Sequence, residues 1–146
     1  MKANLTRVCA ALLGLVVCAA AQDLSPAVLG AKPPFLLVFG CFAGIPTAIG
    51  AGLFADALGG LPFGCSAVFY AAAALAARLA RPMSIGVAIL AAVAYQLWTA
   101  LWGAGDCTVW ALAGALAMAV ILAPTAFALV HLARRRIGLD LREEAP

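Results

Sequence analysis

Charged side chains are scarce in this sequence of 146 residues. Only 10% of the residues are Asp, Glu, Lys or Arg, whereas 66% are hydrophobic. A soluble globular domain carries about 25% charged residues, so this composition excludes a water-facing surface over most of the chain. A chain of this length has no room for a separate soluble module, so we expect a single domain. Because backbone groups in lipid must bond within the protein, we expect that domain to be all-α, a polytopic bundle of transmembrane helices.

Side chains that perform chemistry are equally few. The one histidine, His131, adjoins a basic segment, where it flanks a helix rather than acts as a base. The five cysteines form no CxxC pair and lie mostly in apolar runs, which predicts neither a disulfide framework nor a metal site. The hydroxyls of Ser66 and Thr99 stand alone, and we expect them to bond back to their own helices. The sequence therefore predicts no enzyme, no cofactor and no metal.

Long apolar runs are what the sequence does contain. They predict helical segments at about 5–22, 34–45, 46–58, 63–80, 83–104 and 108–131, in one transmembrane domain over residues 1–133. The last two segments exceed about 20 residues, the length that spans the hydrocarbon of a bilayer. Pro34, Pro62 and Pro82 lie where helices begin, and Pro124 inside the last run predicts a kink.

The first apolar run, residues 8–21, permits two interpretations. The basic residues before it and Ala19-Ala20-Ala21 at its end are also typical of a secretory signal peptide. Because the remainder is polytopic, an uncleaved first helix is the simpler interpretation.

The distribution of charge predicts the orientation in the membrane. The basic residues that set it are Lys2, Arg7, Arg78, Arg81, Arg134, Arg135 and Arg136. Under the positive-inside rule they put both termini in the cytoplasm, whereas Asp23 and Asp106 lie in loops poorer in positive charge. Residues 134–146 then form a basic, later acidic, cytoplasmic tail, which anchors at anionic lipid rather than at nucleic acid.

Termini on the same side require an even number of crossings, so the run 35–55 must contain two segments. Pro46 disfavours a helical conformation at Ile45, which predicts a break there. Each half then has only about 11 to 13 residues, short for a full span. The alternatives are two short helices or a re-entrant hairpin beside four full spans.

Small residues recur at every fourth position from Gly40 to Gly64, with one exception. The series is Gly40, Gly44, Ala48, Gly52, Asp56, Gly60 and Gly64. Small residues at this spacing let helices approach closely in lipid, so we expect the glycines and Ala48 to form packing surfaces. Asp56 is either a functional intramembrane carboxylate or the polar end of a short helix.

The run Gly52-Leu53-Phe54-Ala55-Asp56-Ala57-Leu58, followed by Leu61-Pro62-Phe63-Gly64, resembles a motif of the rod shape-determining protein MreD family. Members carry Gly-Leu-x-x-Asp-x-Leu and then a short loop that ends Pro-x-Gly, which here assigns the motif to Gly52, Asp56, Pro62 and Gly64. The order of segments is also similar, although the distance from Pro34 to Asp56 is short for two complete helices.

This resemblance implies an inner-membrane scaffold in bacterial cell elongation, involved in cell shape and cell wall biogenesis, with no catalytic residues. The implied partners are an MreC-like bitopic membrane protein, the peptidoglycan polymerase and transpeptidase, and indirectly the actin-like MreB. We expect Asp56 to accept hydrogen bonds from backbone amides of the Gly59–Gly60 turn. It would thereby fix the loop 61–64 at a helix junction that a partner engages.

Transport is the alternative, because small six-helix bundles also resemble the substrate-binding components of vitamin-type energy-coupling-factor transporters. The candidates for a polar or aromatic pocket are Tyr70, Tyr95, Gln96, Trp98, Trp102 and Trp110. Their clustering over residues 95–110 favours an aromatic belt at the membrane interface. Gln96 among them predicts a polar contact between helices.

Overall fold

The computed structural model describes residues 2–103 and 108–136, and these residues form six α-helices. The helices are α1 (Lys2–Leu24), α2 (Phe35–Ala43), α3 (Ile45–Gly59), α4 (Cys65–Leu79), α5 (Ser84–Leu101) and α6 (Val109–Arg136). A 3₁₀ turn at Arg81–Met83 precedes α5. Within the described ranges, β pairing is limited to an isolated bridge between Val28 and Ala31. The predicted all-helical architecture with six segments is confirmed.

The main correction to the predicted boundaries concerns the C-terminal tail. The helix α6 runs to Arg136, so Arg134, Arg135 and Arg136 lie in its last turn rather than in a separate tail that begins at 134. Basic residues are compatible with the last turn because they face the negative end of the helix dipole. Asp106, Cys107 and residues 137–146 lie outside the described part of the chain.

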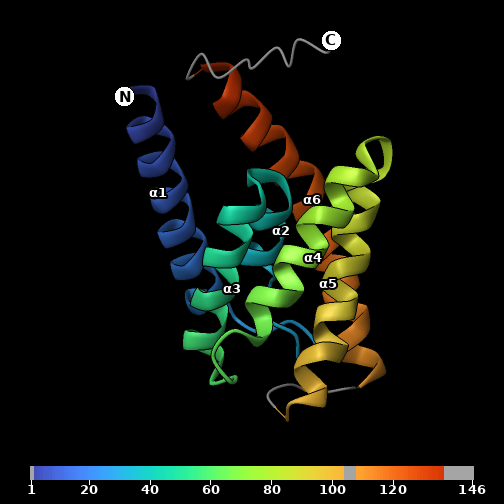
Figure 1. Ribbon diagram of the computed structural model, residues 1–146. Coiled ribbons are helices and arrows are strands. Elements are labelled where there is room, and N and C mark those ends of the chain that lie inside the picture. The colour runs from blue at the N-terminus through green and yellow to red at the C-terminus, as the bar shows by residue number, and fades with distance from the viewer. Residues whose placement is uncertain (1, 104–107, 137–146) are drawn as a thin grey trace.

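The run that begins at Phe35 breaks into two helices at Gly44, one residue before the predicted position. Gly44 has φ +122° and ψ 164°, a conformation that is almost exclusive to glycine. Pro46 lies in the first turn of α3, where its missing N–H leaves no bond unmade. The helix α2 has 9 residues, a length of only about 13 Å, and it packs antiparallel beside α3 (Figure 1). The pair is a hairpin.

The bundle has two distinct ends. Figure 1 shows the start of α1, the end of α6 and the turn between α4 and α5 together at one end, which we call the terminal end. The loops 25–34 and 60–64 lie at the opposite end, the loop end, with the end of α5 and the start of α6. The α2–α3 hairpin therefore opens only toward the loop end, whereas α1, α4, α5 and α6 connect the two ends.

The helix α2 lies at the centre of the bundle and contacts each of the other five helices directly. Its residues Leu36, Leu37 and Val38 are at most 1% exposed. Close contacts elsewhere in the core are made largely by alanine, and the fully buried ones are Ala48, Ala51, Ala88, Ala111, Ala119 and Ala123. Small side chains thus allow the helices to pack closely.

Many of the larger apolar residues lie on the outside of this alanine core. Leu13, Leu90 and Ile121 are between 66% and 70% exposed. Among the described residues, two stretches are long and apolar enough to cross a membrane, Arg81–Leu101 and Val109–Ala133. Shorter apolar helices cover Val8–Leu24, Ile45–Gly59 and Cys65–Leu79.

Candidate functional site

Asp56 joins the end of α3 to the start of α4. Its side chain is 2% exposed, and its carboxylate accepts two backbone hydrogen bonds. The N–H of Gly64 donates to Oδ2 at 2.7 Å, and the N–H of Ser66 donates to Oδ1 at 2.9 Å. Gly64 is the cap residue of α4, and Ser66 is the second residue of that helix. The carboxylate therefore takes the place of an N-cap side chain, although it comes from the preceding helix.

The sequence at the start of α4 explains why the cap is supplied from α3. Gly64 has no side chain, and its φ of +99° is one that side-chain-bearing residues rarely adopt. The first amides of a helix have no partner within the helix, and a carboxylate there is also stabilised by the helix dipole. A hydrogen bond to a charged group contributes about 1.5–3 kcal/mol. Asp56 thus supplies what Gly64 lacks.

Gly52 lies one turn before Asp56 and directly against the backbone of α4. A Cβ atom on Gly52 would lie 2.3 Å from Cα of Ala67 and 2.5 Å from its backbone nitrogen. No side chain fits at these distances, so α3 and α4 approach as closely as glycine permits. This approach brings the first turn of α4 within reach of the Asp56 carboxylate.

The other predicted packing and motif residues lie around the same two helices. A Cβ atom on Gly40 of α2 would lie 3.1 Å from Cα of Ala48, so these residues meet inside the α2–α3 hairpin. Gly60 ends α3 in a left-handed conformation with φ +67°. A Cβ atom on Gly44 or on Gly60 would meet no atom within 4 Å, so the prediction that these two glycines form packing surfaces is wrong, and they serve the backbone conformation instead. Pro62 lies in the following loop, where its carbonyl accepts a hydrogen bond from the N–H of Cys65 at 3.2 Å.

The donors to Asp56 differ from those that the sequence predicts. The amides of the Gly59–Gly60 turn are not its partners, because the C-terminal end of a helix presents free carbonyls rather than free amides. The free amides belong to the first turn of α4, eight and ten positions beyond Asp56. The hydrogen bonds to Asp56 consequently enclose the last residues of α3 and the whole loop that follows, rather than a local turn.

Gln22 caps a neighbouring helix in a similar way. Its Oε1, near the end of α1, accepts a hydrogen bond at 3.1 Å from the N–H of Leu36, the second residue of α2. The cap residue of α2 is Pro34, which has no side-chain acceptor. Gln22 is absent from the residues predicted above. The available signal is an amide side chain that follows the apolar run 8–21 in the last turn of α1.

Ser66 connects the Asp56 junction to α5. Its Oγ lies 2.8 Å from Oη of Tyr95, so the prediction that Ser66 bonds back to its own helix is wrong. The tyrosine hydroxyl of the adjacent helix offers a partner that itself needs one when it leaves water. Thr99 does bond to its own helix, since its Oγ1 donates to the Gln96 carbonyl at 3.0 Å. Tyr70 packs edge-on against Tyr95 with ring centroids 5.0 Å apart.

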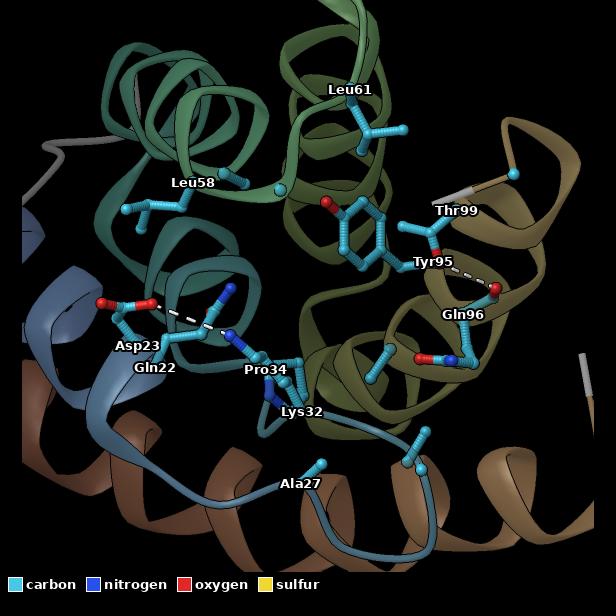
Figure 2. A pocket seen from close by; sticks show the side chains of 16 residues that line it. Gln22, Asp23, Ala27, Lys32, Pro34, Leu58, Leu61, Tyr95, Gln96 and Thr99 are labelled. Carbon is cyan, nitrogen blue, oxygen red and sulfur yellow. Dashed lines mark hydrogen bonds and ion pairs between the residues drawn. The ribbon is translucent and has the colours of Figure 1, made fainter. Parts of the chain in front are cut away.

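A cavity of about 520 Å³ lies at the loop end beside this junction. Its walls come from the end of α1 and the loop after it, the end of α3, the second half of α5 and the start of α6. The polar side chains that line it are Gln22, Asp23, Lys32, Tyr95, Gln96 and Thr99. Figure 2 shows the first three on one side and the last three on the other, with Leu58 and Leu61 above them. Small-molecule sites commonly have a volume of about 300–1,000 Å³.

Asp23 and Lys32 form an ion pair in the charged wall of this cavity. The distance from Nζ of Lys32 to Oδ1 of Asp23 is 3.7 Å, and the side chains are 58% exposed for the lysine and 61% for the aspartate. Pairs of such exposure contribute roughly 0–1 kcal/mol to stability. The pair therefore does little to hold the fold together.

The six aromatic and polar residues proposed for a pocket separate into three pairs. Tyr70 is 1% exposed in the core, and Trp98 packs edge-on against the ring of Trp102. Tyr95 and Gln96 line the cavity. Trp102 and Trp110 are instead 49% and 70% exposed at the end of α5 and the start of α6. These two tryptophans are thus exposed at the loop end, whereas Tyr95 faces the cavity, and the aromatic belt at a membrane interface stays a prediction.

The predicted topology anchors gather at the terminal end. Arg78 lies exposed in the last turn of α4, and Arg81 opens the 3₁₀ turn that follows. The backbones of Arg134, Arg135 and Arg136 end α6 at the same end of the bundle (Figure 1), with their side chains outside the described part. Lys32 is the basic residue that lies at the loop end.

Among the residues that the structure describes, no group of three His, Cys, Asp or Glu side chains is arranged to hold a metal ion. Cys9, Cys18, Cys41 and Cys65 are free thiols. Comparisons with models of protein families, with curated proteins and with solved structures gave no match for this chain. The geometry of the described residues is therefore the evidence for the candidate sites.

Proposed function

We propose that this chain is a multi-pass protein of the bacterial cytoplasmic membrane. The support is the inside-out distribution of its side chains. Large apolar residues such as Leu90, Ile121 and Leu129 are 66–70% exposed, whereas alanines fill the interior. The buried polar or charged residues of the described part are Asp56 and Ser66, and both have hydrogen-bond partners.

The proposed orientation has both termini in the cytoplasm. Its support is the concentration of basic residues at the terminal end, where the positive-inside rule expects the cytoplasm. The residues are Lys2, Arg7, Arg78, Arg81, Arg134, Arg135 and Arg136, against Lys32 at the loop end. In this orientation α1, α4, α5 and α6 cross the membrane, and the α2–α3 hairpin is re-entrant from the outer face.

Within that membrane we propose an MreD-like scaffold role in the cell-elongation machinery. The observation that carries this proposal is the pair of hydrogen bonds from Gly64 and Ser66 to Asp56. Both oxygens of the motif carboxylate accept backbone amides, and Gly52 provides the close approach that makes this possible. These bonds make the motif a structural junction of two helices, and that junction is the support for a scaffold role.

The proposed partners are an MreC-like bitopic protein and the peptidoglycan polymerase and transpeptidase of the elongation complex, with MreB linked indirectly. Purification of the tagged chain from membranes of its host tests this. We expect the MreC-like protein to be recovered with the native chain and with Asp23→Asn, and to be lost with Asp56→Leu. Recovery of no elongation component, from membranes that contain them, contradicts the proposal.

A second candidate function is favoured by the cavity. Two of the residues considered for a transporter pocket, Tyr95 and Gln96, line it together with Thr99. A membrane component that binds a vitamin-sized substrate requires such a site. Recovery of transport ATPases in place of the MreC-like protein in the same purification supports this second candidate.

A further inference from the structure

We propose that the cavity at the loop end binds a small zwitterionic group, one that carries an ammonium and an anionic centre close together. The proposal gives the ligand chemistry for the second candidate function and requires nothing of the scaffold role. The support for it is the arrangement of charge in the cavity wall.

Asp23 and Lys32 are the charged side chains among the described residues that line the cavity. They lie side by side, with 3.7 Å between Nζ of Lys32 and Oδ1 of Asp23. A ligand of one charge attracts one of these residues and is repelled by the other. A zwitterion satisfies both, since its ammonium faces Asp23 and its anionic group faces Lys32.

The ion pair is also accessible to a ligand. Both side chains are more than half exposed, so a ligand reaches them without the burial of an unpaired charge. Gln22 beside them is held in place, because its Oε1 accepts the N–H of Leu36. The Nε2 group of Gln22 is then the part of this amide that donates, and an anionic group next to Lys32 accepts from such a donor.

The opposite wall of the cavity is neutral and fits the remainder of such a ligand. It presents the Tyr95 ring and the Thr99 hydroxyl from α5, with Leu61 above them, while Leu58 adds apolar contact above the charged wall (Figure 2). The Thr99 hydroxyl donates to the Gln96 carbonyl, which leaves its oxygen to accept. The geometry therefore favours a ligand that has a zwitterionic group at one end and a neutral, hydrogen-bonding remainder.

Two sources supply this chemistry, a free amino-acid-like molecule and the headgroup of phosphatidylethanolamine. We would measure thermal unfolding and binding for the full chain in nanodiscs of phosphatidylglycerol. The probes are L-glutamine, glutaramate (the same molecule without its ammonium) and phosphatidylethanolamine added to the bilayer. A rise of the unfolding temperature with glutamine but not glutaramate identifies a free zwitterion, and a rise with phosphatidylethanolamine alone identifies the lipid headgroup; either result supports the proposal.

Variants of the charged wall test the location of the site. Asp23→Asn with Lys32→Gln should lower the affinity for the active probe about tenfold or more. If glutamine is that probe, Asp23→Asn alone should abolish the preference for it over glutaramate. The matched control is Arg78→Gln, an exposed charge at the terminal end, which should change nothing. Stabilisation by none of the probes, or equal affinity in the double variant, overturns the proposal. Neither result affects the recovery of the MreC-like protein, so failure here is separate from failure of the scaffold role.

Discussion

Gly52 and Ala67 bring the backbones of α3 and α4 into direct contact, since a Cβ atom on Gly52 would lie 2.3 Å from Cα of Ala67. The atoms that it would meet belong to the backbone of α4, so they cannot rotate away as a flexible side chain does. The contact precedes Asp56 by one turn and sets the separation across which its carboxylate reaches α4.

The first prediction follows from this contact. Gly52→Ala should destabilise the protein by about 1–3 kcal/mol, because the added methyl group forces the two helices apart. Gly86→Ala in α5 is the matched control, since no atom lies within 4 Å of its added Cβ. That control should be neutral or stabilising by up to about 1 kcal/mol through helix propensity. Unfolding in detergent by added denaturant measures both, and equal stabilities contradict the close contact.

The second prediction concerns the Asp56 cap. Asp56→Asn keeps one acceptor oxygen and turns an NH₂ group toward the other amide, whereas Asp56→Leu removes both acceptors. We expect a loss of about 1–3 kcal/mol for the asparagine variant and about twice that for leucine. Asp23→Asn should change stability by less than about 0.5 kcal/mol because Asp23 is exposed. If both Asp56 variants unfold at the same denaturant concentration as the native chain, the hydrogen bonds to Asp56 do not stabilise the protein.

The third prediction separates backbone conformation from space. A Cβ atom on Gly44, like one on Gly86, has no neighbour within 4 Å, but Gly44 has φ +122°. Gly44→Ala should therefore cost about 1–3 kcal/mol through backbone strain alone, while Gly86→Ala costs nothing. If both variants unfold at the same denaturant concentration, the break between α2 and α3 does not need this conformation.

The fourth prediction measures the hydrogen bond between Ser66 and Tyr95, whose oxygens lie 2.8 Å apart. Ser66→Ala, Tyr95→Phe and the double variant form a double-mutant cycle. The expected coupling energy is about 0.5–1.5 kcal/mol. Additive losses of unfolding free energy, with no coupling, indicate that the two hydroxyls do not interact.

The fifth prediction concerns topology. Reporter fusions after residue 136 and before residue 2 should give the same cytoplasmic location. In a chain whose five native cysteines are replaced by alanine, a cysteine in place of exposed Leu29 in the loop 25–34 should react with an impermeant thiol reagent added outside the cell. The same replacement at Leu79, near the terminal end, should not react. Termini on opposite faces contradict the count of four crossings and a re-entrant hairpin.

Features that depend on neighbouring residues in the chain were predictable from the sequence. Apolar runs located the six helices, and Pro46 located the break between α2 and α3 to within one residue of Gly44. The series of small residues indicated close packing, and Gly52 and Gly40 do lie against other helices. In each case the physical cause is local: hydrophobicity, a missing amide or a missing side chain.

Contacts between helices were less accessible to prediction. The amides that bond to Asp56 lie in the next helix, and nothing at positions 64 and 66 marks a backbone N–H as a partner. The partner of Ser66 lies 29 positions away at Tyr95. The cavity arises only when the ends of α1, α3 and α5 meet, so its charged and neutral walls have no signature in any one segment.

Depletion of the chain in its host tests the proposed role in cell elongation most directly. The account predicts that depleted cells lose their rod shape and become wide or round, and that the native chain and Asp23→Asn restore the rod. The transporter alternative predicts cells of normal shape that fail to take up a nutrient. Cells that keep their rod shape after complete depletion would contradict the scaffold role.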